Sequence, residues 1–139
     1  MTLHPLVHLA GRDQQAIKAL IGRLMAQLGD HILHLTLFGS KARGEDTAES
    51  DIDVLVVTTD DIWPLRHRIL LLGARLSLEH DVLFNLYVIG RERWAWMRQV
   101  GHPLYRNIIA HGVDLIPEVE LAGEEWQRSA PRTDTGEVV

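Results

Sequence analysis

The strand expected from Asp51 to Val57 constrains the fold more than any other part of the chain. Four apolar residues follow Asp53 without a break, and such a run is typical of a strand that is buried on both faces. Side chains alternate along a strand, so Asp51 and Asp53 must point to one side while Ile52 points to the other. The segment therefore predicts a sheet covered by helices, with two carboxylates at the start of one strand.

A turn rich in small residues precedes this strand. The run Gly39-Ser40-Lys41-Ala42-Arg43-Gly44 follows an apolar segment, and ten residues separate Ser40 from Asp51. Gly and Ser in a turn present backbone N–H groups that suit phosphate, and Lys41 and Arg43 add positive charge. Two neighbouring carboxylates repel each other unless a divalent cation lies between them. Phosphate and divalent metal together indicate nucleotide chemistry.

The spacing of apolar residues predicts further helices and strands around these two features. Their order is α-β-(α)-β-α-β-α-α, which is typical of a small mixed β-sheet covered by helices in the α/β (α+β) class. Asp60 or Asp61 is expected to cap the third helix. The core side of that helix would carry Ile62, Leu65, Ile69, Leu72 and Leu76. The expected helices are 13–28, 40–43, 62–80, 91–99 and 103–111, and the expected strands are 31–38, 51–57 and 82–89.

Tryptophans and histidines carry weaker signals. In a helix over 91–99, Trp94 and Trp96 lie about 200° apart, so both rings cannot enter one core. We expect Trp94 to pack inward with Met97. Trp96 is then left either for a partner surface or for packing beneath the last helix or the tail. For the eight histidines we expect structural roles rather than metal binding.

Residues 1–116 are expected to form one domain, because 139 residues are too few for two independent cores. Residues 117–139 form an acidic C-terminal tail, expected to be partly disordered, whose six acids and two arginines supply four of the five net negative charges. The net charge of −5 argues against a nucleic-acid coat. The chain has no cysteine, no signal-peptide pattern and no apolar run near the ~20 residues of a membrane helix, so a cytoplasmic protein is expected.

The two motifs together resemble the signature of a known superfamily. Gly39-Ser40, ten intervening residues and Asp51-x-Asp53 before an apolar strand are similar to the pattern of polymerase-beta-type nucleotidyltransferases. The short chain and the form "Gly-Ser-Lys-Ala-Arg-Gly…Ser-Asp-Ile-Asp" most resemble the minimal, MNT-like members. The resemblance covers roughly residues 33–89 and implies a nucleotidyltransferase-like core and a nucleotidyltransferase activity.

The resemblance also implies roles for individual residues. In such enzymes two Mg²⁺ ions bridge carboxylates and a nucleoside triphosphate, and a hydroxyl attacks the α-phosphorus while pyrophosphate leaves. Asp51 and Asp53 would be the catalytic metal ligands. Gly39, Ser40, Lys41 and Arg43 would bind the nucleotide.

Members of the superfamily place a third carboxylate on a neighbouring strand, where it completes metal binding and helps to deprotonate the nucleophile. The expected strand 82–89 contains no acid. Asp81, at its start, is the first candidate for this catalytic carboxylate, and Glu79 is the second. Asn85 lies within the strand but cannot act as a base.

Three functions follow from these expectations. The first is Mg²⁺-dependent transfer of a nucleoside monophosphate to a hydroxyl; the substrate would be ATP, which donates AMP, or another NTP. Acceptor recognition would come from the last helices, a homodimer or a helical HEPN-type partner, because the resemblance implies a toxin–antitoxin pair in which the transferase modifies its toxin. The second is a catalytically degenerate module, such as a non-enzymatic antitoxin or regulator. The third, an aminoglycoside-type small-molecule transferase, is disfavoured because such enzymes resemble longer chains.

Overall fold

The computed structural model describes residues 9–45, 47 and 50–116. The predicted acidic tail at 117–139, with Trp126, lies outside the described residues. No helix in the described ranges is long and apolar enough to cross a membrane.

A four-stranded mixed sheet forms the centre of the fold, in the order β3-β2-β1-β4. The strands are β1 (Ile32–Phe38), β2 (Ile52–Thr58), β3 (Phe84–Gly90) and β4 (Val113–Asp114). β1 is antiparallel to β2 and to β4, whereas β2 and β3 are parallel. The mixed sheet confirms the predicted fold class. The two-residue strand β4 was not predicted, because two residues are too few to show an alternating pattern.

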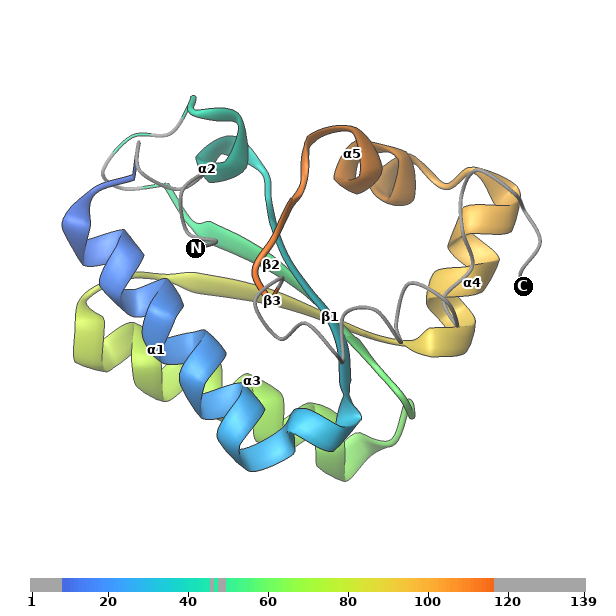
Figure 1. Ribbon diagram of the computed structural model, residues 1–139, viewed down its shortest axis with the longest axis horizontal. Helices are drawn as coiled ribbons and strands as arrows, with labels where there is room; N and C mark the ends of the chain where they lie inside the picture. The colour runs from blue at the N-terminus through green and yellow to red at the C-terminus, as the bar shows by residue number, and fades with distance from the viewer. Residues whose placement is uncertain (1–8, 46, 48–49, 117–139) are drawn as a thin grey trace.

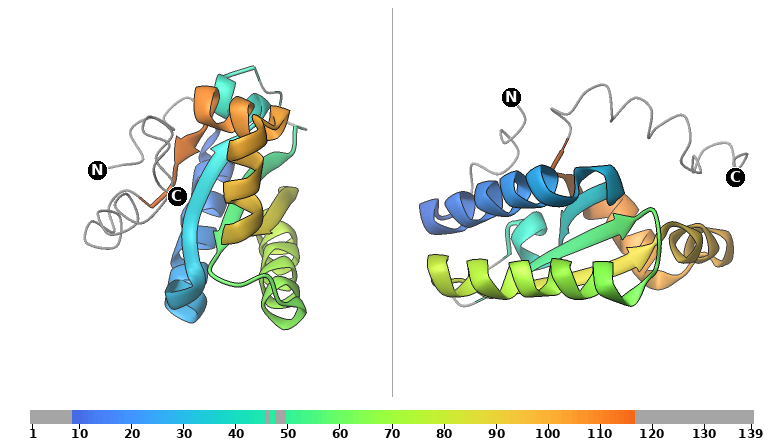
Figure 2. Two further views of the ribbon diagram at one scale, coloured as in Figure 1. Left: turned by 90° about the vertical axis from the view of Figure 1, so that its right-hand side faces the viewer. Right: turned by 90° about the horizontal axis from the view of Figure 1, so that it is seen from below.

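Helices cover both faces of the sheet (Figures 1 and 2). On one face, α1 (Gly11–Leu28) and α3 (Trp63–His80) lie side by side; on the other lie α4 (Arg91–Val100) and α5 (Pro103–His111). A 3-10 turn, η2 (Gly29–His31), leads from α1 into β1. The one-turn helix α2 (Ser40–Arg43) follows β1, as the Ser-Lys-Ala-Arg sequence predicted.

The central strand β2 contributes side chains to two separate cores, as its unbroken apolar run predicted. Ile52, Val54 and Val56 are buried against α1 and α3. Leu55 and Val57 are buried against α4 and α5 on the opposite face. Asp53 lies two residues before Leu55, so its side chain is on the α4/α5 face of the sheet.

The predicted cap of α3 was wrong. Ile62 is the residue before the helix, and its side chain is exposed rather than part of the core. Asp61 instead forms an ion pair with Arg66, with 2.6 Å between Oδ1 and the guanidinium nitrogen. The other four predicted core residues of this helix are buried, namely Leu65, Ile69, Leu72 and Leu76.

The two tryptophans of α4 divide as expected. Trp94 is 5% exposed and packs with Met97, whereas Trp96 is 47% exposed. The Trp94 ring also contacts the buried ring of His34 edge-on, with 5.9 Å between centroids. Burial lowers the pKa of His34 to about 3, so this histidine is neutral and structural.

Candidate active site

Asp53 lies near the start of β2, between β1 and β3, at one end of the sheet. Its register partners are Phe38 on β1 and Asn85 on β3. Asp51 lies just before β2, and its charge acts on Asp53. Both aspartates are half-buried. The predicted proximity of the two carboxylates is therefore present in the fold.

The Asp53 carboxylate is held in a site with excess negative charge. Asn85 Nδ2 donates a hydrogen bond of 3.0 Å to its Oδ1 atom. Burial raises the pKa of Asp53, the Asn85 hydrogen bond lowers it, the charge of Asp51 raises it and that of Arg43 lowers it. Two carboxylate groups are the hard oxygen ligands that Mg²⁺ prefers, so the residues present fit a divalent cation.

Gly39 lies directly against the Asp53 carboxylate. Its backbone has φ 79° and ψ −160°, a conformation almost restricted to glycine. A Cβ atom at this position would lie 2.3 Å from Asp53 Oδ2. The close approach explains why glycine is needed here, and it joins the two sequence motifs into one site.

Ser40 and Arg43 begin and end α2. Arg43 Nε donates a 3.0 Å hydrogen bond to Glu45, and its charge also stabilises the Asp53 carboxylate. Gly44 ends the helix in the left-handed conformation, with φ 76°. In the following connection, the Ser50 hydroxyl accepts a 2.9 Å hydrogen bond from the backbone N–H of Thr47. Through this contact Ser50 helps to shape the turn that leads into β2.

Lys41 has a different environment from the one expected of a phosphate ligand. Its side chain is 1% exposed, and Nζ lies 2.7 Å from Oδ2 of Asp13, which is also buried. Nζ also donates to the backbone carbonyl of Thr47 at 3.2 Å. Sequence reasoning missed Asp13, although a signal was present: it shares the apolar stripe of α1 with Ile17 and Leu20.

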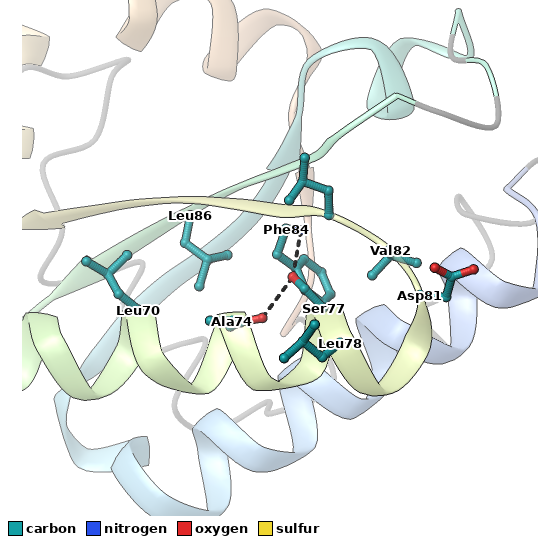
Figure 3. Close-up of a pocket in the computed structure, with 10 residues that line it drawn as sticks. Leu70, Ala74, Ser77, Leu78, Asp81, Val82, Phe84 and Leu86 are labelled. Carbon is teal, nitrogen blue, oxygen red and sulfur yellow. Dashed lines mark hydrogen bonds between the residues drawn. The ribbon is translucent and has the colours of Figure 1, made fainter.

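The structure does not bring Asp81 to the two carboxylates. Asp81 ends α3 in the left-handed conformation, with φ 56°, and its 92% exposed side chain pairs with Arg12 of α1 at 3.3 Å. It lines a groove of about 540 Å³ between α3 and β3 (Figure 3). Phe84 and Leu86 of this groove pack with the α1/α3 core, on the sheet face opposite Asp53. Glu79, the second candidate, pairs with Arg23 of α1 instead.

The register of β2 and β3 explains this outcome. Residues 81–83 connect α3 to β3, so β3 begins at Phe84 and Asn85 lies beside Asp53. Among the described residues, no three His, Asp or Glu side chains form a cluster that could hold a metal ion. In this part of the chain the site therefore offers two carboxylates and one amide.

Comparison with known proteins agrees with this geometry. The family described as "Nucleotidyltransferase domain" matches residues 18–93, a range that includes both motifs and β3. The chain therefore belongs to this nucleotidyltransferase family, as the motifs predicted, and is a nucleotidyltransferase.

Two relatives come from Methanocaldococcus jannaschii. The "Putative protein adenylyltransferase MJ0604" is 31% identical over 100 residues, which cover 72% of this chain and 94% of the relative. The "Putative protein adenylyltransferase MJ0141" is 36% identical over 59 residues, 42% of this chain and 60% of the relative.

The fold is also similar to that of a solved structure. A chain in the crystal structure of a mutant toxin–antitoxin complex, MntA-HpeT, superimposes with a TM-score of 0.52 at 18% identity. The alignment covers 81% of this chain and 84% of that chain. At this identity the likeness shows a shared fold.

Proposed function

We propose that this nucleotidyltransferase is a Mg²⁺-dependent adenylyltransferase that moves AMP from ATP onto a hydroxyl group, with release of pyrophosphate. The observation that carries the proposal is the close approach of Gly39 to Asp53, because it supports a site in which a turn suited to phosphate lies against a carboxylate suited to metal. Relatives whose names describe protein adenylyltransferases support AMP as the transferred group and a protein as the acceptor.

Each residue of the site would have a separate task. Asp51 and Asp53 would hold Mg²⁺, which, when bound, supplies charge neutralisation at the phosphate oxygens. The backbone at Gly39 and Ser40 would hold the outer phosphates. Arg43 would contribute positive charge at the same edge. Asn85 would keep the Asp53 carboxylate in position through its 3.0 Å hydrogen bond.

We further propose that the acceptor is a hydroxyl on a helical HEPN-type partner, in a toxin–antitoxin pair. The shared fold with a chain of the MntA-HpeT toxin–antitoxin complex supports this pairing. The described residues form a single nucleotidyltransferase core, so in this part of the chain an acceptor would need to be presented by another molecule.

A second candidate function is a nucleotide-binding module with little transfer activity. The observation that favours it is Asn85, an amide that cannot accept a proton from the acceptor hydroxyl. Such a module would bind Mg·ATP and mask its partner without modifying it.

One experiment separates the two functions. The protein is incubated with Mg²⁺, ATP labelled at the α-phosphate and a HEPN-type protein encoded beside it. We expect label on the partner, lost in Asp53→Asn and kept in Asp114→Asn. Asp114 is a suitable control because it lies on the far strand β4, hydrogen-bonded to Thr36.

The outcomes are distinct. No label with a Mg·ATP-induced rise in melting temperature would support the binding module; ATP at 100 times its Kd should add ~2.7 kcal/mol to the free energy of unfolding. No label and no thermal shift would contradict both functions.

A further inference from the structure

The stability of the core does not by itself explain the buried ion pair between Lys41 and Asp13. The two side chains are 1% and 4% exposed, and their charged atoms lie 2.7 Å apart. Removing two charges from water costs about as much as their attraction returns, and apolar residues of similar volume are often at least as stable. A pair retained under these conditions needs another explanation, and its position in the fold supplies one.

Lys41 joins three segments that meet at the nucleotide site. It belongs to α2, a single turn that is too short to hold its place by its own hydrogen bonds. Asp13 belongs to the first turn of α1, an 18-residue helix packed in the core, and provides a rigid anchor. A second contact, from Nζ to the Thr47 carbonyl, reaches the connection that leads through Ser50 to Asp51.

The site tolerates little movement of α2. The turn at Gly39 immediately precedes this helix and leaves no room for a methyl group beside Asp53. A shift of α2 relative to α1 would therefore change the distance between the phosphate-binding turn and the carboxylate.

We propose that the Lys41–Asp13 pair is a positioning device for Mg·ATP binding, which fixes the Gly39-Ser40 turn and the approach to Asp51 relative to α1. The inference rests on the proposed function of the same site. It changes the role of Lys41 from a phosphate ligand to a residue that acts through the backbone around it. It also adds Asp13 to the residues on which the site depends.

The test is a double variant, Asp13→Leu with Lys41→Met, which removes both charges and keeps similar volume. We expect its melting temperature to equal or exceed that of the wild type. We expect its Kd for Mg·ATP to rise by about 10- to 100-fold, the range seen when supporting contacts of a site are lost. In the wild type the backbone N–H of Thr47 donates a hydrogen bond to the Ser50 hydroxyl. Hydrogen exchange should show that this N–H loses its protection in the double variant.

A matched control removes an exposed ion pair of the same length. Arg23 of α1 and Glu79 of α3 are also 2.7 Å apart, but both are about half exposed. Arg23→Met with Glu79→Leu should leave nucleotide affinity and the protection of Thr47 unchanged. A second variant, Ser50→Ala, leaves the buried charges in place and should weaken nucleotide binding in the same direction as the double variant.

Two results would overturn the proposal: a folded double variant that binds Mg·ATP as tightly as the wild type, or unchanged protection of Thr47 in the double variant. If the wild type itself does not bind Mg·ATP, the proposed function fails. The exchange data then decide the positioning claim by themselves.

Discussion

Replacing Gly39 with alanine tests the contact that joins the two halves of the site. The added methyl carbon would lie 2.3 Å from Oδ2, 3.1 Å from Cγ and 3.3 Å from Cβ of Asp53. These are three atoms of one side chain, and the carboxylate is also tied through Oδ1 to Asn85. The clash therefore cannot be relieved without moving the carboxylate, the turn or both.

The magnitude has two parts. At φ 79° and ψ −160°, a non-glycine residue costs about 1–3 kcal/mol of folding free energy. Relief of the clash requires a shift of about 1 Å between the turn and the carboxylate, and a misplacement of that size can reduce the rate of a catalysed step by about 100-fold. We expect Gly39→Ala to lower the free energy of unfolding by about 1–3 kcal/mol, the cost of the backbone conformation. We expect it to lower the rate of transfer by about 100-fold.

Urea unfolding measures the loss of stability, and AMP transfer to the proposed partner protein measures the loss of activity. Gly101→Ala is the first control: Gly101 has φ 66°, but its Cβ would meet only Arg106 Cδ at 3.8 Å, far from the site. It should cost stability and leave transfer unchanged. Gly22→Ala is the second control, because Gly22 lies in α1 with open space around it. Alanine at this position should raise the free energy of unfolding by about 0.5–1 kcal/mol.

The reasoning would be refuted if Gly39→Ala kept wild-type transfer and lost no more stability than Gly101→Ala. Loss of transfer in Gly101→Ala to the same degree would also refute it, since general destabilisation would then explain both variants.

Three further predictions concern the core and the carboxylate site. Burial lowers the pKa of His34 from its ordinary value of about 6.5 to about 3, so between these pH values the histidine is protonated in the unfolded chain and neutral in the folded one. The free energy of unfolding should therefore fall by about 1.4 kcal/mol for each pH unit as the pH drops from 6.5 to 3. His34→Phe should lose this dependence in urea titrations, and a slope equal to that of the wild type would contradict the assignment. Asn85→Asp places a third carboxylate beside Asp53, so it should lower the melting temperature without divalent cations and show a larger Mn²⁺-induced rise than the wild type; an unchanged response to Mn²⁺ would count against a cation site there. Leu20→Ala removes a fully buried side chain of α1 and should cost about 2–5 kcal/mol in the same unfolding assay, whereas a cost below 1 kcal/mol would mean that the α1 core is poorly packed.

Local sequence rules predicted the part of the site that lies between β1 and β2. The alternation of side chains placed Asp51 and Asp53 together, and the sequence of residues 40–43 indicated the turn that became α2, although Gly39 rather than Ser40 is its N-cap and no side chain caps it. These features depend on residues a few positions apart, so they can be predicted from the local sequence.

The remaining site contacts depend on how distant segments pack. Asp81 was predicted to be the third carboxylate but does not lie beside Asp53. The length of the connection from α3 to β3 determines which side chain of β3 lies there. Asp13, which pairs with Lys41, lies 28 positions away in α1, and the packing of that helix brings the two charges together. Strand register and helix packing are tertiary properties, and no short-range pattern specifies them.

The arrangement of β1, α2 and β2 has a consequence for how such a sequence can change over generations. A single inserted or deleted residue inside β2 would turn Asp53 toward α1 and α3 and bring Val54 to the Gly39-Ser40 turn, so such changes should be rejected by selection. Length changes between Gly44 and Ser50 leave the alternation of β2 intact. That connection is therefore where related chains can diverge, provided that they keep an acceptor for Lys41 and a hydroxyl before Asp51.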